Sequence, residues 1–156
     1  MSIRAWSPRS WRNVRVRRCT SLDGVDEGQR DQAYQPLTLT RLARLLIGSD
    51  GPRRWRLVAE FLEEYRWEPP EARPDMLAAE PRETGDERWD VFLAALAEHL
   101  AARDGRGAPS WVESRSLRQF WFPFNTRAAR ADAIVHAPAA FRRRGVFVAA
   151  QELEVA

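Results

Sequence analysis

The sequence of 156 residues contains no lysine, one cysteine and two histidines. Because the Walker A phosphate-binding motif requires a lysine, the chain cannot carry that motif. The single cysteine, Cys19, cannot form an internal disulfide, which fits a reducing compartment, and we expect a cytoplasmic protein. Long apolar runs are also absent. No window approaches the roughly 18 consecutive apolar residues of a membrane-spanning helix, so we expect no membrane contact.

The scarcity of histidine and cysteine also argues against metal and catalytic chemistry. His99 and His136 belong to no HExxH or CxxC pattern, and no third ligand follows at a defined spacing. His99 lies at the edge of an apolar stripe and is expected to be partly buried and hydrogen-bonded. His136 follows Asp132 by four residues, a spacing that favours an ion pair on one helix. No carboxylate is marked as a general acid or base, and we expect no enzyme activity, no metal and no cofactor.

Arginine supplies all the basic charge, and it is unevenly distributed. Six of the 25 arginines lie in residues 1–18, which contain none of the 22 acidic residues. The whole chain has a net charge of +3, but the part after residue 18 has a net charge of −3. Because this larger part is mildly acidic, we expect nucleic-acid binding to be weak or absent.

Residues 1–36 show neither helical nor strand periodicity, and glycines and prolines interrupt their isolated apolar residues. Such a stretch buries too little apolar surface to offset its ordering entropy, and we predict a disordered leader. Three other interpretations stay open. In the first the leader is a basic arm that binds nucleic acid, and in the second it is an organellar transit peptide. In the third it is translated from an upstream start codon and does not belong to the native domain.

Residues 37–156 are predicted to form a single domain, because helical periodicity begins near Leu37 and recurs along the rest of the chain. The clearest helix follows Asp86, where five large apolar residues form one stripe. Expected helices cover about residues 39–46, 51–65, 74–80, 87–103, 113–120, 127–137 and 138–144, followed by an extended triplet at 146–148 and a final turn at 151–155. The predicted fold class is all-α, a small globular bundle of about five to seven short helices with at most one short strand.

Aromatic residues gather in a short segment before the last third of the domain. Pro123 keeps some of them out of a helix, and five rings within fourteen residues cannot all lie on one helical face. They are Trp111, Phe120, Trp121, Phe122 and Phe124. Two interpretations stay open: the rings are all core, or they are divided between the core and a partner-binding patch.

Three consecutive arginines, Arg142, Arg143 and Arg144, precede Gly145. Cations in the last turn of a helix compensate its dipole, which is sufficient to explain one or two of them. Successive helical residues point about 100° apart, so the three side chains cannot all hold one anion. We therefore predict that at least one of them reaches an acidic partner surface.

Three blocks of the sequence carry a resemblance to a known family. They are RLVAEFLEEYRWEPPEARP (residues 56–74), TGDERWDVFLAALAEHLA (84–101) and SLRQFWFPFNTRAARADAIVHAPAAFRRRGVFVAAQELEVA (116–156). From Trp55 onward the chain resembles a family of short actinobacterial proteins, and the third block is the most specific. These proteins look like the small partners encoded before nucleotidyltransferase-like toxins. The resemblance implies an antitoxin that binds and neutralises a protein with a nucleotidyltransferase fold.

The predicted function is that of a non-catalytic protein-interaction module, an antitoxin-type partner. It would cover the active cleft of its partner with Trp121, Phe124, Arg142, Arg143 and Arg144. The alternative is a nucleic-acid-binding transcriptional regulator, in which the basic arm and one helix contact phosphates. Charge placement distinguishes the two, because a DNA-binding domain concentrates arginine on one face. The sequence leaves the identity of the partner and the oligomeric state open.

Overall fold

The computed structural model describes residues 34–154. The expectations for residues 1–33 lie outside the described residues, and whether the domain boundary falls at residue 37 stays a prediction. The part from Gln35 onward forms one unit. In the described part of the chain there are six α-helices and two short 3-10 helices, and the only β pairing there is an isolated bridge. The all-α prediction is confirmed.

The first two helices form a pair, α1 (Leu39–Leu46) and α2 (Gly51–Trp67), that pack against each other. Each begins where a side chain satisfies a free amide of the first turn. The Thr38 hydroxyl accepts a hydrogen bond from the amide of Arg41, and the Asp50 carboxylate accepts one from Arg53. One face of α2, formed by Val58, Phe61, Leu62 and Tyr65, lies in the core. Of the leucines at helical spacing in α1, Leu45 is exposed.

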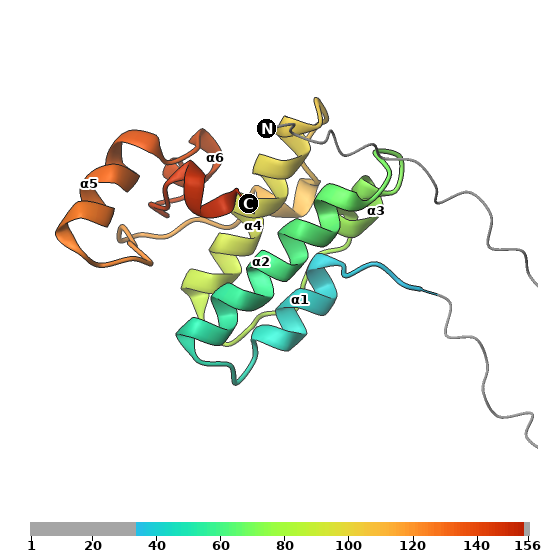
Figure 1. Cartoon of the computed structure of the whole chain (residues 1–156), viewed down its shortest axis with the longest axis horizontal. Coiled ribbons are helices and arrows are strands. Elements are labelled where there is room, and N and C mark those ends of the chain that lie inside the picture. Colours follow the sequence, from blue (N-terminus) through green and yellow to red (C-terminus); the bar gives the residue numbers. More distant parts are fainter. Residues whose placement is uncertain (1–33, 155–156) are drawn as a thin grey trace, which may run out of the picture. The chain divides into compact units, whose positions relative to one another are not determined.

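Helix α4 (Glu87–Arg103) is the centre of the domain. It contacts α1, α3 (Arg73–Ala78), α6 (Ala139–Arg142) and the 3-10 helix η1 (Ser110–Val112). Figure 1 shows α4 passing behind α2. Ten of its 17 residues are buried, and they include alanines outside the predicted stripe. The predicted stripe is therefore correct but too narrow, because neighbours on several sides cover the small side chains of α4.

The predicted helix over residues 113–120 is wrong. After η1 the chain instead runs without regular structure to Trp121, which forms a parallel bridge with Val146. The amide of Leu117 donates to the carbonyl of Arg144, and the amide of Trp121 donates to the carbonyl of Gly145. Backbone groups that a helix would have paired locally are thus paired with a distant segment.

The C-terminal part contains α5 (Arg127–His136), α6 (Ala139–Arg142) and η2 (Ala150–Leu153). Thr126 caps α5, but α5 buries only Ala133. The predicted extended triplet at 146–148 and the final turn are confirmed. Phe141, Val146, Val148 and Leu153 extend the core beyond α4. The segment that carries α5 and α6 is thus attached to the helical core by α6 and these apolar residues.

Candidate partner-binding surface

The aromatic segment divides into rings that join the core and rings that face outward. Trp121 and Phe124, both predicted to bind a partner, are half-buried and pack against the core. The Trp121 ring lies 5.5 Å from that of Trp89, and the Phe124 ring lies 4.7 Å from that of Trp55. Aromatic pairs at these separations stabilise a core beyond their area of burial. These two residues therefore support the fold, and only part of each ring is open to a partner.

A second cluster of rings, the outer aromatic patch, consists of the exposed Phe120 and the half-buried Phe122 and Phe147. Phe147 stacks on Phe122 with 5.0 Å between ring centroids, and Phe120 meets Phe147 edge-on at 5.1 Å. The guanidinium of Arg130 lies over the Phe122 ring, 4.7 Å from its centroid. Phe120 is 73% exposed, which is unusual for a phenylalanine in contact with other rings. Aromatic and arginine side chains together are the composition that protein interfaces favour.

The extended backbone around Trp121 explains this division. In an extended segment successive side chains point to opposite sides, so Phe120 and Phe122 point away from the side that Trp121 occupies. The bridge fixes this register, because the amide of Phe147 donates to the carbonyl of Trp121 at 2.8 Å. The alternation was visible in the sequence as Phe-Trp-Phe, but the helical interpretation of residues 113–120 hid it. Phe122 and Phe147 are the residues that sequence reasoning missed as candidates for this surface.

Two of the three consecutive arginines, Arg143 and Arg144, contact the same carboxylate, that of Glu98. Arg142 is exposed and Arg143 is largely exposed. Arg143 forms an ion pair with Glu98 of α4 and donates from Nε to the same carboxylate. Arg144 is buried. The structure therefore leaves Arg142 and Arg143 accessible to a partner and places Arg144 inside the domain.

Arg144 joins three parts of the domain. Its Nη2 lies 2.7 Å from Glu98 Oε2, and its Nη1 donates to the carbonyls of Val112 and Arg115. The side chains of Arg144 and Glu98 are only 5% and 12% exposed. A buried arginine is tolerated where its charge is paired and its donors are satisfied, and both conditions hold here. Arg144 therefore ties α4 to the loop after η1, and this role corrects the prediction that it contacts a partner.

The remaining large ring of the aromatic segment, Trp111, is structural. Its indole N–H donates to the carbonyl of Leu77 at 3.1 Å, and the ring is half-buried. The guanidinium of Arg115 lies over this ring and also pairs with Glu80. These contacts hold the loop after η1 against the end of α3.

The two histidines occupy different environments. His99 is half-buried, and its ring lies 5.8 Å from that of Phe141. Burial lowers the pKa of His99, and the charge of Arg103 lowers it further. His136 is exposed and forms the predicted contact with Asp132, with 2.7 Å between Nδ1 and Oδ1. Among residues 34–154, no three histidine, cysteine or acidic side chains are arranged to hold a metal ion.

The charge of the described residues is balanced. Residues 34–154 contain 18 arginines and 18 acidic residues, so their net charge is zero. The acidic surplus after residue 18 therefore comes entirely from residues 19–33. This corrects the expectation of an acidic domain and weakens the charge argument against nucleic-acid binding.

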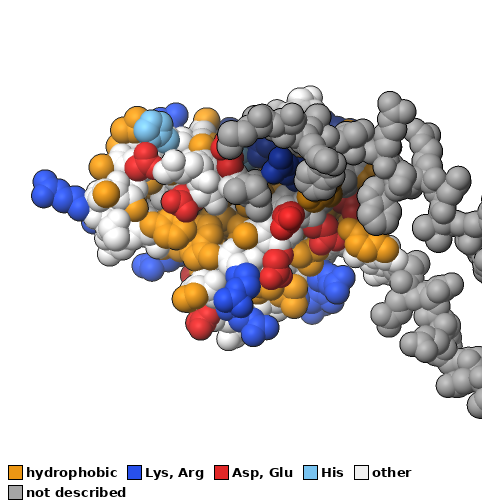
Figure 2. All heavy atoms as spheres, in the orientation of Figure 1, with side chains coloured by type: hydrophobic (Ala, Val, Ile, Leu, Met, Phe, Trp, Pro, Cys, Tyr) orange, Lys and Arg blue, Asp and Glu red, His pale blue; other side chains and the backbone are white. Residues whose placement is uncertain are grey.

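The face drawn in Figure 2 shows hydrophobic side chains gathered between the α5 end of the molecule and the α1–α2 helices, with charged side chains at the border.

Comparisons of the chain with protein-family models, with curated proteins and with solved structures find no match. In the described part of the chain, no helix is both long and apolar enough to cross a membrane.

Proposed function

We propose that this chain is a non-catalytic protein-interaction module that binds its partner through the outer aromatic patch and the neighbouring arginines. The observation that carries the proposal is the exposure of Phe120, held at 73% beside Phe122 and Phe147. A phenylalanine side chain gains on the order of 1.5–3 kcal/mol from full burial, and a partner can supply this gain. Arg130 at the patch and Arg142 nearby in sequence provide cationic groups for the rim of such an interface.

The partner that we propose is a protein with a nucleotidyltransferase fold, which this chain would bind and neutralise as an antitoxin. This partner class follows from the family resemblance. The surface described above is compatible with it, because the exposed Phe120 fits an apolar cleft and arginines fit the metal-binding carboxylates of a nucleotidyltransferase.

The test uses a candidate partner with a nucleotidyltransferase fold, taken from the gene next to that of this chain if that gene encodes one, and purified with wild-type or variant protein. We expect Phe120→Ala to weaken the complex by about 30-fold or more, the effect of losing an interface hot spot. Trp67→Ala is the matched control, because Trp67 is also highly exposed, at 79%, but lies at the end of α2. Equal effects of the two substitutions, or none, would refute the proposed surface.

Growth of cells that express both proteins tests neutralisation separately from binding. We expect wild-type protein and Trp67→Ala to restore growth and Phe120→Ala to restore it poorly. If a complex can be purified but changes neither nucleotidyltransferase activity nor growth, the proposed interaction module is supported and the proposed antitoxin role is refuted.

A second candidate function is single-stranded nucleic-acid binding, favoured by Arg130, which lies over the half-buried pair of Phe122 and Phe147. Bases stack on such rings, and arginines contact the phosphates. Fluorescence anisotropy with single-stranded and duplex oligonucleotides at about 150 mM salt distinguishes this function, since electrostatic contacts alone weaken steeply in salt. Tight binding that Phe120→Ala abolishes would place this function first.

A further inference from the structure

Helix α5 has the smallest buried share of the α-helices in the described part of the chain. Only Ala133 of its ten residues is buried, whereas ten of the 17 residues of α4 are. Ile134 and Val135 are 54% and 66% exposed, and Figure 1 shows α5 at the edge of the unit, away from α1, α2 and α3. Because a helix of this length is marginal in water by itself, α5 depends on the few contacts that it makes.

The side-chain contacts of α5 with other segments lie at the surface. Asp132 accepts a hydrogen bond from Gln151 at 2.8 Å, and the guanidinium of Arg130 lies over the Phe122 ring. Gln151 and Arg130 are both exposed. Water competes for such contacts at the surface, so each of them stabilises α5 only slightly.

A groove of about 210 Å³ lies between α5 and two rings of the domain. Ala129 and Ala133 line the groove from α5, and Phe124 and Phe147, both half-buried, line it from other segments. Close-packed protein interiors contain few spaces larger than a water molecule. The small side chains of α5 thus lie over an apolar surface without filling the space next to it.

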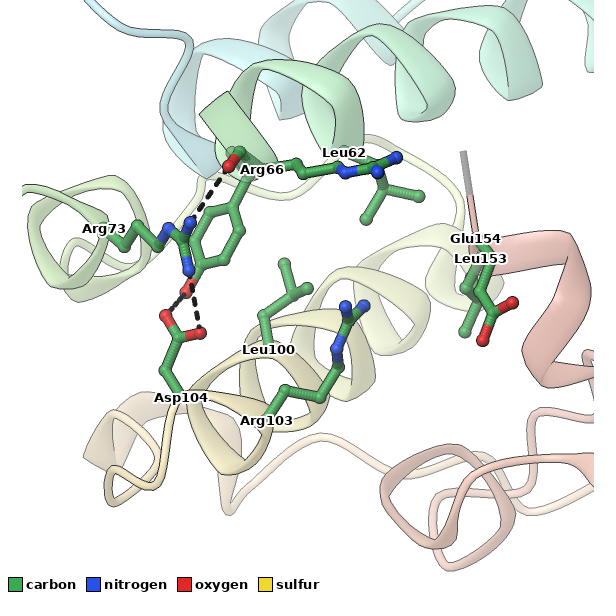
Figure 3. A pocket seen from close by; sticks show the side chains of 9 residues that line it. Leu62, Arg66, Arg73, Leu100, Arg103, Asp104, Leu153 and Glu154 are labelled. Carbon is green, nitrogen blue, oxygen red and sulfur yellow. Dashed lines mark hydrogen bonds and ion pairs between the residues drawn. The ribbon is translucent and has the colours of Figure 1, made fainter. Parts of the chain in front are cut away.

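The contact between α2 and α4 shows the opposite case. A cavity of about 530 Å³ also lies there (Figure 3), but Leu62 and Leu100 beside it are buried. The Tyr65 hydroxyl donates to Asp104 Oδ2 at 2.8 Å, and Arg73 Nη1 lies 3.2 Å from Asp104 Oδ1. Buried leucines and a paired carboxylate thus hold α2 to α4, and neither feature connects α5 to the described residues around it.

Both ends of the α5 segment are anchored in the core. Before α5, the Phe124 ring lies 4.7 Å from that of Trp55. After α5, Ala137 is buried, and the Phe141 ring of α6 lies 5.4 Å from the Phe92 ring of α4. α5 can therefore unfold while the chain on either side stays in place, and such a local opening requires less free energy than unfolding of the whole domain.

We propose that α5 is a cover that opens by local unfolding and uncovers Phe124 and Phe147, which then join Phe120 in one apolar surface for the protein partner. The role of the partner rests on the proposed function, whereas the opening of α5 does not. Because only the open fraction presents the enlarged surface, the closed state lowers the apparent affinity in proportion to that fraction. The closed state also hides apolar surface that would otherwise favour non-specific association.

Hydrogen–deuterium exchange of the full chain, followed by NMR, measures the opening. We expect the amides of Asp132 and Ala133 to exchange at least about 100-fold faster than those of Phe92 and Leu96 in α4. Urea at about 1 M should accelerate exchange in α4 but hardly in α5, because a local opening exposes little surface. Equal rates with equal urea dependence would mean that α5 opens only with the whole domain, which overturns the proposal.

Two substitutions shift the opening in opposite directions. Ala129→Leu extends a side chain into the groove against Phe124 and Phe147 and should slow exchange in α5 by about tenfold. Ala131→Leu is the matched control, because Ala131 is exposed and lies outside the groove. Gln151→Ala removes the hydrogen bond to Asp132 and should accelerate exchange by about threefold, whereas Gln35→Ala, at an exposed residue before α1, should not. Equal effects of the two leucine variants would contradict the proposal.

The complex with the candidate partner connects opening to binding. Affinity and opening should change by the same factor, so Ala129→Leu should weaken the complex by about tenfold and Gln151→Ala should strengthen it by about threefold. If both variants bind like the wild type while Phe120→Ala weakens the complex, α5 is not a cover of this surface, and the proposed function stands without it. If none of the three substitutions changes binding, the proposed surface and its cover are both refuted.

Discussion

Arg144 and Glu98 show how one buried ion pair connects segments that are distant in the chain. The pair joins residues 46 positions apart, and the same guanidinium donates to two carbonyls of the loop after η1. No local pattern in the sequence marks Glu98, because a glutamate in a helix is usually a solvated residue. What sets it apart is the surrounding burial of α4, which follows only from tertiary packing.

Removing one member of this pair should destabilise the domain strongly. Arg144→Gln leaves the Glu98 carboxylate buried and without its main partner, and we expect a loss of about 3–5 kcal/mol in the free energy of unfolding. Arg142→Gln, at the exposed neighbour, should change it by less than about 0.5 kcal/mol. Urea titrations of both variants measure the difference. A loss below about 1 kcal/mol for Arg144→Gln would mean that the pair contributes little.

His99 should make stability depend on pH. Its pKa is lower in the folded domain than its ordinary value of 6.5, mainly because burial disfavours the charged imidazolium. Below about 6.5 the unfolded chain therefore binds a proton that the folded domain resists, and stability falls as the pH decreases through this window. Thermal melts of wild-type and His99→Gln protein between about pH 5 and 8 isolate this contribution. The wild type should lose more stability toward low pH than the variant, and parallel curves would contradict this.

At the scale of elements, local signals in the sequence were sufficient to predict a helix wherever the backbone N–H and C=O groups pair within that helix. Asp86 and the residues that follow predicted α4 with its correct bounds, because a capping carboxylate and a repeated apolar stripe are both local features. The error over residues 113–120 has the opposite origin. The amides of Leu117 and Trp121 are satisfied by Arg144 and Gly145, and a pairing across this separation leaves no periodic trace in either segment. The outer aromatic patch depends on that pairing, so the sequence showed the alternation of Phe120, Trp121 and Phe122 but not that Phe147 joins them.

Gly145 is the position where this pairing is most sensitive. Its φ of +80° is disfavoured for residues with a side chain, and an added Cβ would lie 3.2 Å from the carbonyl oxygen of Leu117. Gly145→Ala should therefore combine backbone strain with a steric conflict and lower stability by more than about 2 kcal/mol.

Gly105→Ala separates the two causes. Gly105 has a similar φ of +69°, but no atom lies within 4 Å of the added Cβ. This substitution should cost only the strain of about 1–2 kcal/mol. Guanidinium unfolding of both variants measures the difference in the free energy of unfolding. Equal losses would show that the Leu117 segment moves away from the added Cβ without loss of stability.

At the scale of the whole molecule, the charge of the chain changes near residue 34. The described residues have a net charge of zero, whereas residues 1–18 are basic and residues 19–33 are acidic. The net charge after residue 18 combines the acidic residues 19–33 with the neutral residues 34–154. The expectation of an acidic domain was therefore wrong. Which of the candidate arginines a partner can reach also depends on the fold, since the fold buries Arg144 and leaves Arg142 exposed.

Among the described residues, the buried core begins at Leu37. Leu37 is buried, its amide donates to Glu64 Oε1 at 2.9 Å, and Thr38 caps α1. Removing residues 1–33 should therefore change the melting temperature by less than about 4 °C, the effect of about 1 kcal/mol in a domain of this size. Removing residues 1–38 takes away both the cap and a buried leucine, and the melting temperature should fall by about 10 °C or more. Scanning calorimetry of the full chain and the two shortened chains makes the comparison. If the shorter deletion already lowers the melting temperature as much as the longer one, residues 1–33 contribute to the core.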